Sequence, residues 1–189
     1  MISPPVCHLK PGKGVPHEKY SDYLRRSVPE NLHKAILEKL RESLPEAQLD
    51  DLFSLYPDFQ IDVAAEQEKL KQADLVILQD PVYWYNVPSL THRWFEEVLR
   101  YGWAYGEGGM ALAGKRAIIG LTAGGDAASY GTGPESVISA ADVIRPIELI
   151  FRYCHMDVLG TVFTTSMPGH DPKKYEEHAR EILDVAAKA

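Results

Sequence analysis

A short apolar segment followed by an aromatic loop and a helix constrains this fold more than any other feature. Leu75–Leu78 is long enough for a buried strand and too short for a helix. The loop Gln79–Pro88 follows and carries the aromatic run Tyr83–Tyr85, and Ser89 is positioned to cap a helix of amphipathic spacing. Loops at the carboxyl ends of strands are where α/β proteins bind flat ligands. The alternative is that the rings only cover the sheet.

The same alternation of strands and helices continues along the chain. The expected strands are Val6–Leu9, Gln48–Leu55, Leu75–Leu78, Arg116–Leu121 and Val158–Thr165. Helices are expected from the Ser27–Glu30 capping box to Pro45, over Val63–Gln72 behind the cap Asp62, after Ser89, over Ser136–Tyr153 with a kink at Pro146, and over Asp171–Ala187. This alternation predicts one α/β domain over residues 1–189, a flavodoxin-like three-layer sandwich with a five-stranded parallel sheet in the order 2-1-3-4-5. Residues 1–26 are irregular, and the Pro4-Pro5 pair leaves the first strand uncertain.

Composition excludes several classes of protein. A net charge of −7 over 189 residues argues against nucleic-acid binding. There is no apolar segment of membrane-spanning length and no signal peptide, and the two cysteines lack C-x-x-C spacing, so we expect a cytoplasmic protein without membrane insertion. The histidines and cysteines have no metal-ligand spacing, so no metal site is predicted. P-loop and G-x-S-x-G motifs are absent from the sequence.

Three sequence motifs carry a resemblance to a known family. These are Pro81–Pro88 (PVYWYNVP), Arg93-Trp94 and Tyr101–Gly106 (YGWAYG). Together they resemble the flavodoxin-like NAD(P)H:quinone oxidoreductases, and in particular the bacterial branch of general stress protein 14 and the ancillary reductases of potassium efflux. The similarity extends from about Leu52 to the helix near Cys154, which is over half of the chain.

The resemblance implies FMN as cofactor, with FAD as the alternative flavin, and NAD(P)H as co-substrate. It assigns the flavin ring to the backbone of two loops, whose residues are Pro81, Val82, Tyr83, Trp84, Tyr85, Thr122, Ala123, Gly124 and Gly125. Independently of it, the glycines of Thr122–Gly125 let backbone N–H groups approach a planar ring, although an ordinary Gly-Gly turn is the structural alternative.

The resemblance also implies roles for side chains. Tyr130 corresponds to a catalytic tyrosine that hydrogen-bonds the flavin, and the histidine that some relatives carry six residues later is Ser136 here. Nicotinamide and a quinone are expected to stack in turn against Trp84, Trp103 and Tyr105. A homodimer with its sites at the interface is implied as well.

The N-terminal segment departs from the family pattern. Relatives bind the flavin phosphate after a hydrophobic first strand, and the candidates here are His8, Ser27 and Asn31. Ser27 and Asn31 lie far downstream of the weak first strand, although a helix N-terminus can also bind phosphate. Asp80 is a second departure, because relatives usually have an apolar residue before this proline. We therefore expect weakened retention of FMN.

These observations lead to an FMN-dependent oxidoreductase that transfers hydride from NAD(P)H to quinones or related electrophiles. Two alternatives stay open. One is an ancillary flavoprotein subunit that binds a cytoplasmic domain of a potassium-efflux transporter. The other is a degenerate flavodoxin-like protein without flavin.

Overall fold

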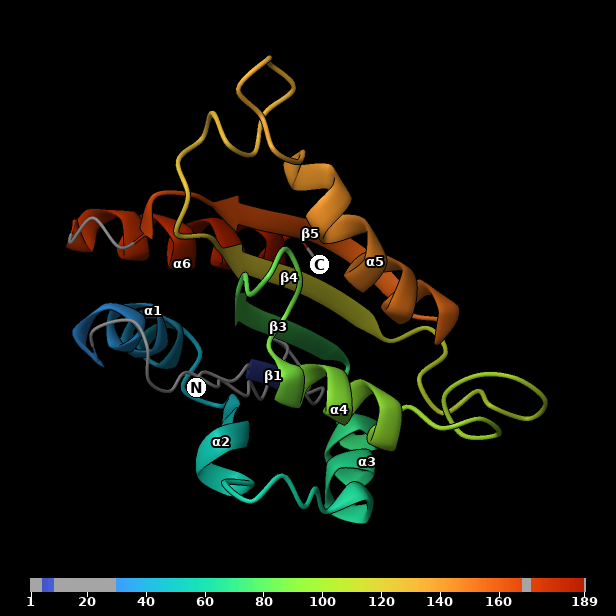
Figure 1. The fold of residues 1–189 in the computed structure, drawn as a ribbon. Coiled ribbons are helices and arrows are strands. Elements are labelled where there is room, and N and C mark those ends of the chain that lie inside the picture. The colour runs from blue at the N-terminus through green and yellow to red at the C-terminus, as the bar shows by residue number, and fades with distance from the viewer. Residues whose placement is uncertain (1–4, 9–29, 168–170, 189) are drawn as a thin grey trace.

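The computed structural model describes residues 5–8, 30–167 and 171–188, and Figure 1 shows their arrangement. The strands are β1 (Pro5–His8), β2 (Gln48–Asp51), β3 (Leu75–Pro81), β4 (Arg116–Thr122) and β5 (Asp157–Thr164). The helices are α1 (Glu30–Ser43), α2 (Leu52–Leu55), α3 (Val63–Gln72), α4 (Ser89–Val98), α5 (Ala140–Tyr153) and α6 (Pro172–Ala186). The strands form one sheet in the order β2-β1-β3-β4-β5. This is the flavodoxin-like order predicted from the sequence.

The direction of the first strand differs from the prediction. The ladders β3–β4 and β4–β5 are parallel, whereas β1 pairs antiparallel with both β2 and β3, so the prediction of a fully parallel sheet is wrong for β1. The strand has four residues and starts with Pro5, which cannot donate a ladder hydrogen bond. Its register with β3 is limited to the pair Val6↔Leu78. So short a strand carries little sequence information about its direction, and an antiparallel pair needs no right-handed crossover.

Alternating residues of the central strands face two separate cores. Val76 and Leu78 of β3 pack into a core shared with α3, α4 and α5, whereas Leu75 and Ile77 pack into a core shared with α1 and α6. This is the period-two pattern of a sheet covered on both faces. Gly120 lets α6 approach the sheet, since a Cβ there would lie 2.7 Å from the Ile182 side chain. The structure therefore contains the three layers predicted from the sequence.

Several predicted boundaries move. β3 continues through Gln79 and Asp80 to Pro81, which were assigned to the loop, because parallel pairing with β4 runs to Pro81↔Thr122. The expected strand Gln48–Leu55 divides into β2 and the short helix α2, because Asp51 accepts hydrogen bonds from the amides of Phe53 and Ser54 and so caps a helix.

The expected helix starts also need correction at two places. Ser89 is the first residue of α4, and the N-cap is Pro88, without a side-chain hydrogen bond. α5 starts at Ala140 instead of Ser136, because Ser139 caps it by accepting a hydrogen bond from the Asp142 amide. Ser27 of the expected capping box lies outside the described residues. The cap Asp62 is confirmed, and Asp171, expected as the first residue of the last helix, is its N-cap.

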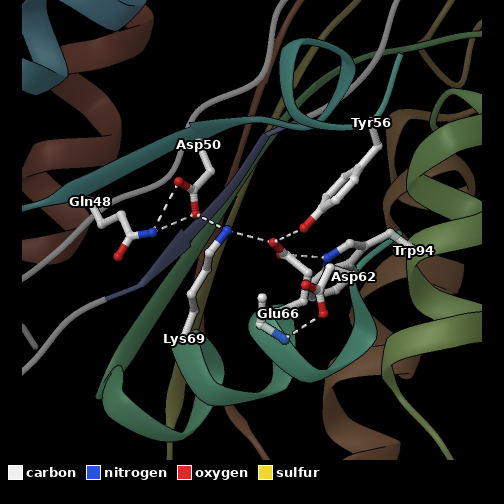
Figure 2. A network of polar contacts seen from close by, with 8 residues as sticks. Gln48, Asp50, Tyr56, Asp62, Glu66, Lys69 and Trp94 are labelled. Atoms are coloured by element: carbon white, nitrogen blue, oxygen red, sulfur yellow. Dashed lines mark hydrogen bonds and ion pairs between the residues drawn. The ribbon is translucent and has the colours of Figure 1, made fainter. Parts of the chain in front are cut away.

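A buried polar network ties α3 to the helices around it (Figure 2). Glu66 of α3 has no exposed surface, although a glutamate in a helix is usually solvated. Its carboxylate accepts hydrogen bonds from Tyr56 Oη (2.8 Å), Trp94 Nε1 (2.8 Å) and Lys69 Nζ (2.5 Å). Lys69 also pairs with Asp50 of β2 at 3.0 Å. Both carboxylate oxygens of Glu66 are therefore occupied, as burial of a charge requires.

Candidate active site

The aromatic loop after β3 is a tight turn in an unusual backbone conformation. The amide of Tyr83 donates to the carbonyl of Asn86 at 2.6 Å, and the amide of Asn86 donates to the carbonyl of Tyr83 at 3.0 Å. The two residues between them, Trp84 and Tyr85, have φ values of 48° and 62°. Positive φ at both central positions is typical of a type I′ turn, which normally uses Asn and Gly. Bulky residues in this region are strained, and such strain is concentrated at functional sites.

The rings of this turn do not cover the sheet. Trp84 is 92% exposed and Tyr85 is 46% exposed. The structural alternative from the sequence, in which the aromatic run only shields the strands, therefore fails for these two residues. A flat apolar group held open to solvent is suited to stacking against a planar ligand.

The loop after β4 lies beside this turn. The amide of Val82 donates to the carbonyl of Thr122 at 2.7 Å, which joins the two loops directly. The amide of Ala123 donates a hydrogen bond to the carbonyl of Thr164 at 2.8 Å. Among the described residues, no hydrogen bond is donated by the amides of Gly124 and Gly125. These two N–H groups are therefore the donors of the loop that remain for a ligand, whereas Ala123 could contribute only its other atoms.

Tyr130 lies against the same loop. A Cβ on Gly125 would be 3.0 Å from the Tyr130 ring, and the Tyr130 and Phe163 rings are 5.2 Å apart. Partial burial, with a smaller contribution from Tyr85, raises the pKa of the Tyr130 phenol above its ordinary value. The phenol therefore keeps its proton at neutral pH and can donate a hydrogen bond. Tyr85 contributes to this shift, which is consistent with the expectation that the two tyrosines lie at one site.

Ser136 does not replace the histidine that some relatives carry. Its hydroxyl lies 2.6 Å from the Gly131 carbonyl and 3.2 Å from the Ile138 carbonyl. Since a hydroxyl has one proton to donate, these contacts give it a structural role in the segment between β4 and α5. Tyr130 thus has no relay partner at position 136.

Trp103 and Tyr105 are not brought to Trp84 within one chain. Both follow α4, which runs back along the sheet, and Figure 1 shows their loop at the opposite end from the turn after β3. The Tyr105 ring lies 5.2 Å from the ring of Tyr153, the last residue of α5. The predicted set of three stacking aromatics is therefore divided between two ends of the chain.

Of the N-terminal candidates, the structure describes only the backbone of His8 and Asn31. His8 pairs with Gln48 at the start of β2, so its backbone is at the edge where β3 begins and not where it ends. Ser27 lies outside the described residues. Asn31 is in the first turn of α1, where only the backbone is described. The reversed direction of β1 is the reason that the prediction fails for His8.

A groove lies away from the two loops. It has a volume of about 590 Å³ and lies between α4 and α5, with His92, Phe95, Glu96, Leu99, Tyr105, Ile150, Tyr153 and Cys154 as its lining. Burial raises the pKa of the Cys154 thiol to about 11, so this cysteine is not a nucleophile at neutral pH. Of the helices in the described ranges, none combines the length and hydrophobicity needed to cross a membrane.

The donors and rings at this edge of the sheet fit a planar, electron-accepting cofactor such as a flavin. Gly124 and Gly125 offer N–H groups, the strained turn offers an exposed ring, and Tyr130 offers a protonated phenol. Reduction of a flavin adds negative charge to its ring, and preorganised N–H and O–H donors stabilise such charge. The residues expected to bind the flavin phosphate are either outside the described residues or described by their backbone alone.

Comparison with known proteins identifies the fold independently. The family model described as "Flavodoxin-like fold" matches residues 20–186. General stress protein 14 from Treponema denticola, solved in complex with FMN, is 34% identical, with a TM-score of 0.75 over 84% of this chain and 91% of that chain.

Two further structures share the fold. A chain described as a thermophilic tryptophan halogenase from Streptomycin violaceusniger is 29% identical, with a TM-score of 0.76 over 84% and 91% of the two chains. An NADPH-quinone reductase from P. pentosaceus is 22% identical, with a TM-score of 0.71 over 82% and 89%. The stated activities differ between these proteins, so the architecture is what they have in common. With the family model covering most of its length, the chain belongs to the flavodoxin-like family.

Proposed function

We propose that this protein is an FMN-dependent oxidoreductase that transfers hydride from NAD(P)H to a quinone or a related small electrophile. The observation that carries the proposal is the pair of joined loops beside the strained aromatic turn, where the amides of Gly124 and Gly125 donate no hydrogen bond to any described residue. The 34% identical general stress protein 14, solved with FMN, supports the choice of cofactor. The NADPH-quinone reductase at 22% identity shares the fold and fits the acceptor class.

The residues of this chain would divide the work as follows. The amides of Gly124 and Gly125 would donate to the flavin ring where negative charge develops, and the backbone of Pro81–Tyr85 would hold its other edge. Tyr130, with its raised pKa, would donate a hydrogen bond and not act as a base. Trp84 would stack against the flat substrate. When bound, FMN would supply the chemistry of accepting hydride from NAD(P)H and passing it to the acceptor.

Titration of the apoprotein with FMN and with riboflavin tests the cofactor assignment. We expect FMN to bind and to support oxidation of NAD(P)H, with parallel double-reciprocal plots because one stacking surface serves both substrates in turn. A phosphate site weakened by the displaced first strand predicts substoichiometric FMN in the purified protein. Each charge-assisted hydrogen bond that is missing lowers the affinity by about one to two decades. Affinity for FMN far above that for riboflavin would show that the phosphate site is intact.

The same titration separates the two alternative functions. A degenerate flavodoxin-like protein would bind neither flavin. An ancillary subunit of a potassium-efflux transporter would bind FMN, but would depend on its partner for activity. Rapid oxidation of NAD(P)H by the isolated, FMN-loaded protein would favour the oxidoreductase over the ancillary subunit.

We also propose that the active unit is a homodimer, because one chain leaves its stacking aromatics at opposite ends. The groove between α4 and α5 is lined by Tyr153, which is more than half exposed, and Tyr101, whose ring lies 6.0 Å from that of Tyr105 in the lining, is also more than half exposed. A second copy seated there would bring its Trp103 and Tyr105 to the first copy's ring-binding loops.

Co-expression of Tyr105→Ala and Tyr130→Phe chains tests this arrangement. Mixed dimers would contain one intact site, so activity should recover to about a quarter of the wild-type value. Activity no higher than the average of the two variants would argue against shared sites.

A further inference from the structure

A row of polar side chains crosses the face of the sheet that α6 covers, close to the ends of the strands that carry the two candidate loops. His178 of α6 and Gln79 of β3 are each 1% exposed. The His178 Nε2 atom lies 2.5 Å from Gln79 Oε1, and its Nδ1 atom lies 2.8 Å from the hydroxyl oxygen of Thr164 in β5. Polar groups buried in an apolar core are costly unless they are hydrogen-bonded. The roles proposed above do not use this row.

His178 reaches β3 because the residue of β4 between them is a glycine. Gly120 pairs with Gln79 in the parallel ladder, and a Cβ there would lie 2.2 Å from Gln79 Oε1 and 3.2 Å from His178 Nε2. Since an amide oxygen only accepts hydrogen bonds, Nε2 carries a proton and donates it to Gln79. In the neutral ring, Nδ1 then accepts from the Thr164 hydroxyl. One histidine thus joins the ends of β3 and β5 across β4.

The segment after β5 holds the loop after β4 by backbone hydrogen bonds. The Thr164 carbonyl accepts from the Ala123 amide at 2.8 Å, and the Ala123 carbonyl accepts from the Met167 amide at 3.1 Å. The Ser166 amide donates to the Gly125 carbonyl at 2.7 Å. The position of this glycine loop therefore depends on the position of the segment after β5. The two amides that are expected to bind the flavin ring belong to the loop that is held in this way.

Two side chains of α6 fix that segment in turn. Tyr175 has no exposed surface, and its hydroxyl donates to the carbonyl of Met167. His178, on the next turn of the helix, contacts Thr164. The two contacts lie at opposite ends of the segment, so α6 supports the glycine loop through its whole attachment to β5.

We propose that His178 is a positioning residue of the ring site, which acts through Thr164 to hold the loop after β4 where its amides meet the flavin ring. The inference rests on the proposed flavin site. The contact with Gln79 ties the same histidine to β3, which ends two residues later at Pro81 in the other candidate loop. Preorganised N–H donors stabilise the negative charge that reduction adds to a flavin, and hydrogen bonds to a charged acceptor are the stronger ones. A loop without this support should therefore lose affinity for reduced FMN more than for oxidised FMN. The alternative is a histidine that only stabilises the core.

Measurement of the midpoint potential of bound FMN tests this role. His178→Leu removes both polar contacts and keeps an apolar side chain of moderate size. Its reduced FMN should bind about tenfold more weakly relative to oxidised FMN, as expected when one charge-assisted hydrogen bond is weakened, which lowers the two-electron potential by about 30 mV. Thr164→Val removes the hydroxyl and keeps the carbonyl, so it should lower the potential as well. Because both changes act through one contact, the double variant should show no more than the larger single shift.

Two conservative substitutions divide the contacts of His178. His178→Asn places a carbonyl oxygen near the position of Nδ1, where it can accept from Thr164, and gives up the contact with Gln79. His178→Gln places an amide nitrogen near the position of Nε2, where it can donate to Gln79, and gives up the contact with Thr164. We expect the wild-type potential in His178→Asn and a lowered potential in His178→Gln. The reverse result would overturn the role of Thr164.

Ile182→Ala is the control for a purely structural effect. Ile182 lies one turn further along α6, is fully buried in the same core and has an apolar side chain. Its replacement should lower the thermal stability and leave the potential at the wild-type value.

The outcomes separate this inference from the function on which it rests. Failure of the wild-type protein to bind FMN would overturn both. FMN binding with the same potential in wild type and His178→Leu would overturn the role of His178 alone, as would an equal shift in Ile182→Ala. If His178→Leu does not fold, Thr164→Val carries the same prediction. A lowered potential in the variants that lose the Thr164 contact, and in no others, supports the inference.

Discussion

Two polar regions of this molecule contrast in how their hydrogen-bonding groups are used. In the Glu66 network, both oxygens of a fully buried carboxylate are occupied, by groups from α3, α4 and the segment after α2. At the edge where β3 and β4 end, Gly124 and Gly125 donate no hydrogen bond within the described chain, and Trp84 and Tyr85 adopt left-handed backbone angles. A satisfied network stabilises the fold, whereas strain and spare donors are useful only when a ligand completes them.

The contrast predicts opposite responses to substitution. Changes in the Glu66 network should cost stability at any ligand concentration. Changes at the ring-binding edge should alter binding and rate while leaving the apoprotein as stable as before, or more stable. The four predictions below test this difference, in order of decreasing effect.

Glu66→Ala should give the largest loss of stability. The change leaves the Tyr56 hydroxyl and the Trp94 indole N–H without their acceptor and leaves Lys69 with Asp50 alone. Removing one member of a buried ionic network costs about 3–5 kcal/mol. Urea unfolding of the apoprotein measures this loss. Glu68→Ala, on the exposed face of the same helix, is the control and should stay within about 0.5 kcal/mol of wild type. A loss below about 1 kcal/mol for Glu66→Ala would show that the network is dispensable.

The same network should make the fold sensitive to alkaline pH. Burial and then Glu66 raise the pKa of Tyr56 well above its ordinary value. Burial lowers the pKa of Lys69, but Glu66 and Asp50 outweigh this and raise it overall. Both groups therefore hold their protons more tightly in the folded protein than in the unfolded chain. Their stabilisation is complete below the unfolded pKa values, near 10 to 10.5, and is lost as the pH rises above them.

Unfolding free energies measured between pH 8 and pH 11 test whether stability falls as the pH rises. Each group should contribute a loss of up to about 1.4 kcal/mol per pH unit above pH 10. Tyr56→Phe removes one of the two titrating groups, so the slope should become shallower in this variant. A stability that is flat to pH 11 would contradict the prediction.

The sequence predicts some features of the Glu66 network and of the edge where β3 and β4 end, but not others, for physical reasons. The strands β3 and β4 and the caps Asp62 and Asp171 follow from apolar runs and local hydrogen bonding, which short-range patterns encode. The burial of Glu66 could not be predicted, because its partners Tyr56 and Trp94 lie 10 and 28 residues away. In sequence, Glu66 has the same appearance as the exposed Glu68 beside it on α3.

The candidate site shows the same division. The two loops of the candidate site contain glycines or aromatics that directly follow apolar strands, which is a local pattern. By contrast, the placement of Trp103 and Tyr105 at the other end depends on the direction in which α4 returns along the sheet. Asp80 was noticed only as a departure from a pattern, and its burial against Thr91 depends on β3 continuing to Pro81. The direction of β1 has no local signal in four residues.

Tyr130→Phe should slow hydride transfer by about tenfold without changing stability. The phenol is the part of Tyr130 that would donate to the flavin, whereas its ring packs against Phe163 and stays in place in the variant. The effect should fall at or below the lower end of general acid catalysis, about 10²-fold, because Ser136 bonds to backbone carbonyls and offers no relay. Stopped-flow reduction of the FMN-loaded protein measures the rate. An unchanged rate would remove Tyr130 from the mechanism, and lowered stability would give it a structural role instead.

The smallest effect, and the one that sets the two regions apart most clearly, is expected from relaxing the aromatic turn. The double variant Trp84→Asn and Tyr85→Gly places in the turn the residues that tolerate positive φ at both central positions. Because the side chains are exposed, little burial is lost, and relief of backbone strain should stabilise the apoprotein by about 1 kcal/mol. Loss of the stacking ring should at the same time weaken binding of the quinone to the FMN-loaded protein by up to about tenfold, as expected for an aromatic contact of about 0.5–1.5 kcal/mol. Thermal unfolding of the apoprotein and titration of the FMN-loaded protein with a quinone measure the two effects separately. A variant that loses both stability and affinity would show that the turn supports the fold, and the contrast with the Glu66 network would then fail. A gain in stability together with a loss of affinity would mean that the strain in this turn is retained for binding.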